Sequence, residues 1–362
     1  MYIVIITSLI AWYLTYLESY GRKEGGMKIG FAMLTFLAVI HYDYGNDYMG
    51  YYNLYKGLLG YSSITSVLDS DVYRDVGWAA INYVFQYLGG FFSLVAVVSI
   101  IEGVVYYQAI RRYLPRELWW FGTFIYLFAT SFYLLNFSML RQGLVIAIFL
   151  AVYPLIENRK WWLAAPILYL CSFVHGSALL LVPFAFWGFL PIKNGKTWVV
   201  AFSVILVAMY LSSQFLASIP RFVMENTDAF EYYEDTYSES DTTTKFGLGF
   251  VIYLIPTIVT IFFLGNKNAD ERTKRLVALS CLGAFFTPLS TVVPMIGRVG
   301  MYFGMFRIMA LPVSYKAISN KALRVGVTAL YIAIVLFDYY LFFSSEVFGE
   351  HYKEFHTIFS QI

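Results

Sequence analysis

The chain has 362 residues, of which 59 % are hydrophobic and only 13 % are charged. Soluble globular domains carry about 25 % charged residues, so this composition excludes an ordinary soluble enzyme. The formal net charge is +2, and the basic residues form short clusters between apolar runs, which argues against a nucleic-acid-binding surface. The composition therefore predicts a membrane protein with several spans.

Long apolar runs follow one another along most of the chain. A helix needs about 20 apolar residues to cross the hydrocarbon core of a membrane, and dividing the sequence at its polar interruptions predicts about 12 crossings. The expected fold is an all-α polytopic membrane protein, with residues 1–362 as a single integral membrane domain. The third run is long enough to begin as a surface helix before Gly89-Gly90. The predicted spans are 1–18, 27–41, 77–107, 118–136, 142–156, 161–174, 177–190, 197–217, 246–264, 275–292, 299–315 and 323–343.

Lysine and arginine clusters fall in alternate loops and predict the orientation. Cytoplasmic loops are enriched in these residues, so the amino terminus is expected outside the cell. The first apolar run has no small-residue cleavage site and is interpreted as a membrane helix. The two cysteines, Cys171 and Cys281, lie inside apolar runs and indicate neither a disulfide framework nor a metal site.

The first predicted outer loop, residues 42–76, combines acidic and aromatic side chains. Carboxylates accept hydrogen bonds from sugar hydroxyls, and aromatic rings stack on the C–H faces of sugars, so this mixture favours a carbohydrate site. An aromatic belt at the membrane surface is the alternative interpretation, because tyrosine is enriched there without any ligand. The residues expected to bind substrate in this loop are Asp43, Tyr44, Tyr48, Tyr51, Tyr52, Arg74 and Asp75.

A second outer loop, residues 218–245, is long and acidic. Its functional interpretation is a lid over a glycan groove, and the alternative is a solvated surface loop.

Lysine and arginine are usually enriched in cytoplasmic loops, so basic or titratable residues on the predicted outer side indicate a specific role. Arg141, followed by Gln142 and Gly143, stands at a helix start, where free backbone N–H groups also favour anions, and Gln142 is expected to bind substrate. The planar guanidinium group suits phosphate, so Arg141 and Arg298 are expected to bind it. His175 lies on the same predicted side at a helix end.

Cations and a carboxylate are the minimum for sugar transfer from a diphosphate carrier. Cations stabilise the leaving group, and a carboxylate removes the proton from the attacking hydroxyl. Asp47 is the expected base, with Asp43 and Asp75 as alternatives. Arg141, His175 and Arg298 complete the expected catalytic set. The acidic residues form a thin ligand set for a divalent cation, so neither a metal nor another cofactor is expected.

At these residues the sequence resembles the EpsG family of bacterial exopolysaccharide proteins, which is grouped with Wzy-type polysaccharide polymerases. The matching segments are Gly45-Asn46-Asp47-Tyr48, Asp75-Val76-Gly77-Trp78, Arg141-Gln142-Gly143, the segment around His175, and Arg298-Val299-Gly300-Met301-Tyr302-Phe303.

The resemblance implies a glycosyltransferase in the bacterial plasma membrane, with a GT-C-like multi-helix bundle and an active-site face on the outer side. The implied donor and acceptor are oligosaccharide repeat units on undecaprenyl diphosphate, for O-antigen, capsule or exopolysaccharide. Membrane lipids and a chain-length regulator are further implied partners, and nucleic acid is not.

A transporter or flippase of the same lipid-linked glycan is the main alternative. It would need ionisable groups near the bilayer midplane on several helices. We expect Glu102 and Arg307 near helix ends and Asp338 late in the last helix, so the sequence favours an enzyme. A membrane acyltransferase is disfavoured because no intramembrane histidine is expected.

Overall fold

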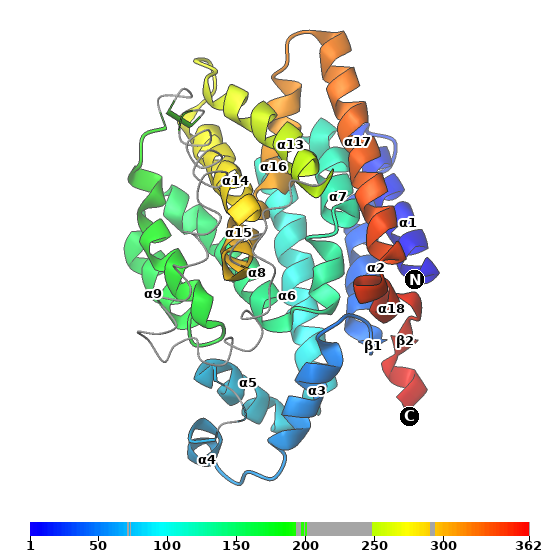
Figure 1. The fold of residues 1–362 in the computed structure, drawn as a ribbon, viewed down its shortest axis with the longest axis vertical. Coiled ribbons are helices and arrows are strands. Elements are labelled where there is room, and N and C mark those ends of the chain that lie inside the picture. The colour runs from blue at the N-terminus through cyan, green and yellow to red at the C-terminus, as the bar shows by residue number, and fades with distance from the viewer. Residues whose placement is uncertain are drawn as a thin grey trace. The chain divides into compact units, whose positions relative to one another are not determined.

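The computed structural model describes residues 1–70, 72, 74–192, 197, 198, 200, 248–289 and 294–361. The chain forms two compact units, one of residues 1–190 and 320–362 and the other of residues 191–319. The predicted acidic loop 218–245 and most of the predicted span 197–217 lie outside the described residues. Figure 1 shows the fold as a ribbon.

The first unit contains the helices that are long and apolar enough to cross a membrane. Among the described residues these are α1 (Tyr2–Ser19), α6 (Gly90–Tyr113), α8 (Leu140–Glu157) and α17 (Lys321–Ser344). Shorter apolar helices are α2 (Gly26–Ile40), α9 (Trp161–Cys171) and the 3-10 helix η3 (Gly176–Phe189). The protein is thus a helical membrane protein, while the count of about 12 crossings stays a prediction.

Small residues allow these helices to pack closely. Gly30 of α2 faces α1, where an added Cβ atom would lie 2.9 Å from the Cα atom of Ala11. Gly103 of α6 makes a similar approach to Thr35 of α2. Membrane helices associate through such contacts because lipid supplies no hydrophobic drive between them.

The predicted span 77–107 is two helices, α5 (Val76–Tyr87) and α6. The chain breaks at Gly89, whose φ angle of 96° is accessible to glycine at little cost. The break at Gly89-Gly90 was predicted. It moves the start of the spanning helix to Gly90, so Glu102 lies in the middle of α6 and the expectation that it lies near a helix end was wrong.

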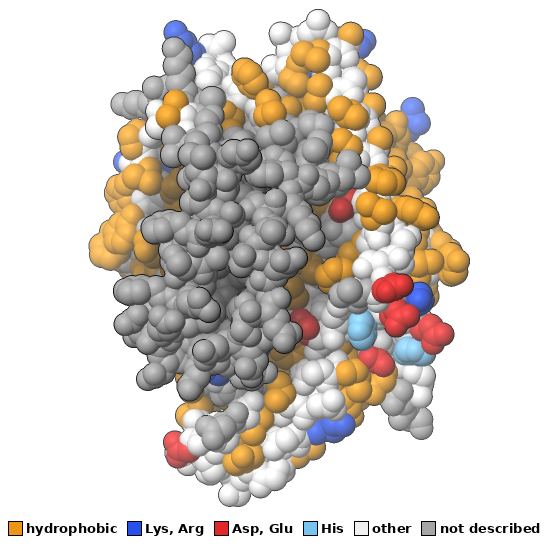
Figure 2. Space-filling model, in the orientation of Figure 1, with side chains coloured by type: hydrophobic (Ala, Val, Ile, Leu, Met, Phe, Trp, Pro, Cys, Tyr) orange, Lys and Arg blue, Asp and Glu red, His pale blue; other side chains and the backbone are white. Residues whose placement is uncertain are grey.

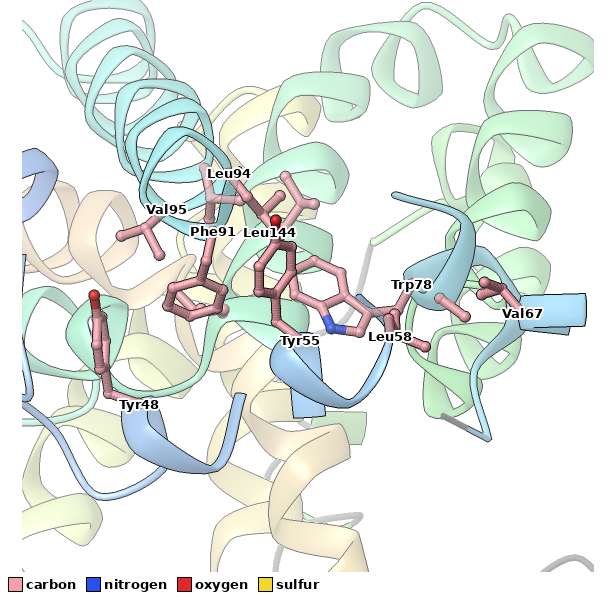
Figure 3. Close-up of a cluster of buried hydrophobic side chains, with 12 residues drawn as sticks. Tyr48, Tyr55, Leu58, Val67, Trp78, Phe91, Leu94, Val95 and Leu144 are labelled. Atoms are coloured by element: carbon pink, nitrogen blue, oxygen red, sulfur yellow. The ribbon is translucent and has the colours of Figure 1, made fainter. Parts of the chain in front are cut away.

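The predicted outer loop 42–76 is partly helical and has its own core. It contains α3 (Tyr48–Gly57) and α4 (Ile64–Leu68), and Figure 1 shows both at the same end of this unit as α5. Figure 3 shows Tyr48 and Tyr55 beside Phe91 at the start of α6, with Leu58 next to Trp78 of α5. The aromatic side chains therefore attach this segment to the spanning helices.

The carboxyl-terminal part of the chain returns to the same segment. Helix α18 (Glu346–Lys353) is followed by β2 (His356–Thr357) and the 3-10 helix η5 (Ile358–Gln361). Strand β2 pairs in antiparallel fashion with β1 (His41–Tyr42). An all-α prediction does not anticipate this two-stranded ribbon, since two residues per strand leave no recognisable pattern.

The remaining helices follow the predicted runs, except that the predicted spans 118–136 and 299–315 are each divided between two helices. In the first unit, α7 (Trp119–Phe128) and the 3-10 helix η2 (Tyr133–Phe137) replace the predicted span 118–136, and the 3-10 helix η1 (Arg116–Leu118) precedes α7. The second unit contains α13 (Leu248–Leu264), α14 (Glu271–Leu289), α15 (Pro294–Gly304) and α16 (Arg307–Lys316).

Candidate functional site

An ion pair between Asp75 and Arg141 is the centre of the site. Asp75 precedes the first residue of α5, and Arg141 lies in the first turn of α8. The Nη1 atom of Arg141 lies 2.6 Å from the Oδ2 atom of Asp75. The Asp75 carboxylate does not cap its own helix, and it accepts a hydrogen bond of 3.1 Å from the backbone N–H of Gly176 instead. It therefore joins the starts of α5, α8 and η3.

His175 lies beside the same carboxylate. Its Nδ1 atom is 4.0 Å from the Oδ2 atom of Asp75. The backbone N–H groups of Gly77 and Trp78 both donate to the carbonyl of Phe173, at 2.8 and 3.3 Å. A Cβ atom on Gly77 would lie 2.7 Å from that carbonyl oxygen. The His175 turn is thus fixed on α5 at a position that requires glycine.

Tyr51 of α3 connects this pair to Asp47. The Arg141 guanidinium lies over the Tyr51 ring, with Cζ 5.4 Å from the ring centre. The electrostatic neighbours of the Tyr51 phenol are Arg141 and Asp47. Burial raises the pKa of the phenol, with Arg141 opposing the shift, so Tyr51 is neutral near pH 7.

Asp47 is exposed and lies immediately before α3. Its backbone N–H donates to the Oγ atom of Ser138, at 3.0 Å. Gly45 has a φ angle of 115°, and a Cβ atom there would lie 2.8 Å from the carbonyl oxygen of Phe137. The Asp47 turn is therefore anchored on the segment just before Arg141, which places the two predicted catalytic residues in one region.

Burial and the nearby cations act on Asp75 in opposite directions. Partial burial of the carboxyl raises the pKa of Asp75 above its ordinary value, and the charges of Arg141 and Arg74 oppose that shift. Arg74 is exposed beside it and adds positive charge at the same place.

The other residues predicted to bind substrate differ in burial and in their contacts with neighbouring rings. Tyr44 and Tyr48 have no exposed surface and pack against aromatic neighbours, so they have no ring face open to a ligand in this conformation. Tyr52 is half-buried and stacks on Phe92. Asp43 is exposed with a φ angle of 48°, and Gln142 is buried.

Arg298 lies in α15 of the second unit and is partly buried. Its part in the site stays a prediction. Among the residues that the structure describes, no group of three His, Cys, Asp or Glu side chains could hold a metal ion.

Sequence reasoning missed the groups that position the site. Ser138 and the carbonyls of Phe137 and Phe173 hold the Asp47 and His175 turns. Backbone carbonyls have no signal in a sequence. Glycines beside the motif residues, Gly45 and Gly77, were the available clue to close backbone contact.

The model of the EpsG family matches residues 27–355. No curated protein and no solved structure matches the chain. The matched range contains every site residue described above and most of the chain. The predicted resemblance is confirmed, and the chain belongs to the EpsG family.

Proposed function

We propose that the protein is a polysaccharide polymerase, a glycosyltransferase that joins undecaprenyl-diphosphate-linked repeat units on the outer side of the bacterial plasma membrane. The family and the apolar helices support a role in polysaccharide biosynthesis in a membrane. The observation that carries the finer proposal is the grouping of Asp47, Tyr51, Arg141, Asp75 and His175 around the start of α8.

Arg141 is assigned to the diphosphate of the donor. A guanidinium has five N–H donors in a planar fork, which suits a phosphate group better than an ammonium does. The start of α8 adds partial positive charge at the same place. Asp75 holds one edge of the guanidinium and so fixes its orientation. Arg298 is proposed as a second cation that binds the diphosphate, and Arg74 adds positive electrostatic potential beside Arg141.

Asp47 is assigned to the acceptor hydroxyl. In the transfer, the acceptor oxygen forms a bond to the anomeric carbon while the bond from that carbon to the diphosphate oxygen breaks. The hydroxyl proton passes to the Asp47 carboxylate, and the bonding pair leaves with the diphosphate, where Arg141 stabilises it. His175 is placed beside Asp75 to support the Arg141 position.

Tyr51 and Tyr52 are assigned to the sugars. Both side chains are only partly buried, whereas Tyr44 and Tyr48 serve as core residues. The sugar-binding role expected for four tyrosines is therefore proposed for these two.

A transporter of the lipid-linked glycan is the alternative function. Its ionisable groups would be spread along several helices near the midplane. Glu102 lies in the middle of α6, but the residues assigned to the transfer gather at the starts of α3, α5, α8 and η3, which favours chemistry at one surface.

The deciding experiment supplies purified protein with repeat units linked to undecaprenyl diphosphate. We expect a ladder of longer products from the wild-type protein and none from Asp47→Asn. Asp69→Asn is the matched control, because Asp69 is an exposed carboxylate in the same outer loop and has no assigned role. If the donor moves across a vesicle membrane and no ladder of longer products forms, the protein would instead be a transporter.

A further inference from the structure

Glu102 is an acidic residue that the proposed transfer does not use. It lies in the middle of α6, one of the helices able to cross a membrane, and its side chain is 1 % exposed. Neither carboxyl oxygen has a hydrogen-bond partner among the described residues. A buried polar group without a partner is uncommon in proteins and requires an explanation.

The Glu102 side chain lines a small polar cavity inside the first unit. The cavity lies between α2, α6, α7 and η2, and it is close to the size of one water molecule. Its polar lining consists of Thr35, Ser99, Tyr126, Tyr133 and Asn136.

Among the described residues that line the cavity, no cationic side chain compensates a charge on Glu102. No Lys, Arg or His is among its lining residues, and the titratable groups that face Glu102 are Tyr126 from α7, Tyr133 from η2 and Tyr106 one turn along α6. Two of the hydroxyl groups already donate elsewhere, Tyr133 to the Leu34 carbonyl at 2.9 Å and Ser99 to the Ala38 carbonyl at 3.0 Å. An ionised carboxylate would lack the partners that buried charges need.

The carboxyl also abuts the helix that bears Arg141. A Cβ atom on Gly143 of α8 would lie 2.4 Å from the Oε1 atom of Glu102. Gly143 is two residues from Arg141, in the first turn of α8. A charge on Glu102 would form directly against this turn, where the Gly143 N–H already donates to the Met139 carbonyl and is not a donor to the carboxylate.

We propose that Glu102 is a proton-binding site inside the membrane bundle. It holds its proton as a neutral carboxylic acid, hydrogen-bonded to one water in the polar cavity, and it keeps the first turn of α8 in place. A neutral acid has one O–H donor and retains acceptors, which a single water can satisfy. The site does not depend on the proposed transfer reaction.

Infrared spectroscopy of purified protein at neutral pH tests the proposal. A protonated carboxylic acid has a carbonyl stretching band that ionised carboxylates lack, and the protein should be kept in a detergent without carbonyl groups. We expect the band in wild-type protein, its loss in Glu102→Gln, and its retention in Asp75→Asn. Absence of the band in wild-type protein, or its persistence in Glu102→Gln, would overturn the assignment.

Two further measurements test whether the Glu102 carboxyl holds a proton or an alkali cation, and whether it contacts α8. Replacing choline chloride by sodium chloride should leave the band unchanged, and its loss in sodium would mean an alkali-cation site instead.

Gly143→Ala should shift the band, since the carboxyl must move. Gly326→Ala, where an added Cβ atom meets nothing within 4 Å, is the control. An unshifted band in folded Gly143→Ala would contradict the contact with α8.

Discussion

At the scale of single residues, Asp75 receives a side-chain donor from α8 and a backbone donor from the start of η3. Because burial raises the pKa of this carboxyl, it becomes protonated at a higher pH than an ordinary aspartate. Protonation weakens the ion pair that orients Arg141.

The polymerisation rate should therefore fall as the pH drops through the raised pKa of Asp75. In a plot of rate against pH, the fall on the acidic side (the acidic limb) should occur at a pH above about 3.9, the ordinary pKa of aspartate. In Asp75→Asn the part of this limb that Asp75 causes should be lost, leaving only the fall caused by protonation of the proposed base, Asp47, and the rate should be lower at every pH. Initial rates measured across the acidic range check this, with Asp69→Asn as the control. A limb of unchanged position in Asp75→Asn would exclude Asp75 as its cause.

Arg141→Lys should lower the polymerisation rate about 10–100-fold, because hydrogen bonds to charged groups contribute about 1.5–3 kcal/mol. Lysine keeps the charge but loses the planar fork and the contact with the Tyr51 ring. Arg298→Lys should do the same if it binds the diphosphate. Rates and donor binding are the measurements.

Arg111→Lys is the matched control for the arginine variants. Arg111 also lies over aromatic rings, those of Tyr107 and Trp119, in the last turn of α6. Equal losses in Arg111→Lys and Arg141→Lys would indicate a general effect on the fold and not on the donor.

At the scale of elements, α18 and β2 fasten the turn that carries Asp47. The His351 carbonyl accepts from the Gly45 N–H at 3.1 Å, and the Tyr352 hydroxyl donates to the Leu134 carbonyl at 3.1 Å. The Tyr352 ring also packs against Tyr44. Figure 2 shows acidic and histidine side chains gathered near this end of the chain, where Lys353 pairs with Glu350 and His356 with Glu354.

Tyr352→Phe should therefore destabilise the protein by about 1 kcal/mol, the usual net value of one hydrogen bond. The melting temperature should fall, and the rate should fall with it because the Asp47 turn loosens. Tyr340→Phe is the control, since Tyr340 is 66 % exposed. Equal melting temperatures for the two variants would contradict the fastening role.

The helices were largely predictable from apolar runs, and so was the break at Gly89-Gly90. The grouping of motif residues followed from the family resemblance, but their contacts did not. Asp75 and Arg141 are 66 residues apart, and no periodicity links them. The outer loop proved partly helical, because its tyrosines contribute to a core as well as to a surface.

At the scale of the whole molecule, cysteine labelling at the two ends of α8 tests the proposed orientation in the membrane. The two ends of α8 carry the proposed site and the Asn158 turn. Single cysteines at Asn53 and Asn158, both exposed, should react with an impermeant reagent from opposite sides, Asn53→Cys from outside intact cells. The native cysteines are buried and should stay silent. Labelling of Asn158→Cys alone in intact cells would reverse the proposed topology.

The bridging carboxylate of Asp75 also has a consequence for the order of biosynthesis. The ribosome releases residue 75 long before residue 141, and Gly176 follows 101 residues after Asp75. Until α8 has entered the membrane the carboxylate has neither partner and must remain hydrated at the surface, and until η3 follows it lacks the Gly176 donor. A nascent chain halted before residue 176 would thus contain most of the motif residues and still have no assembled site.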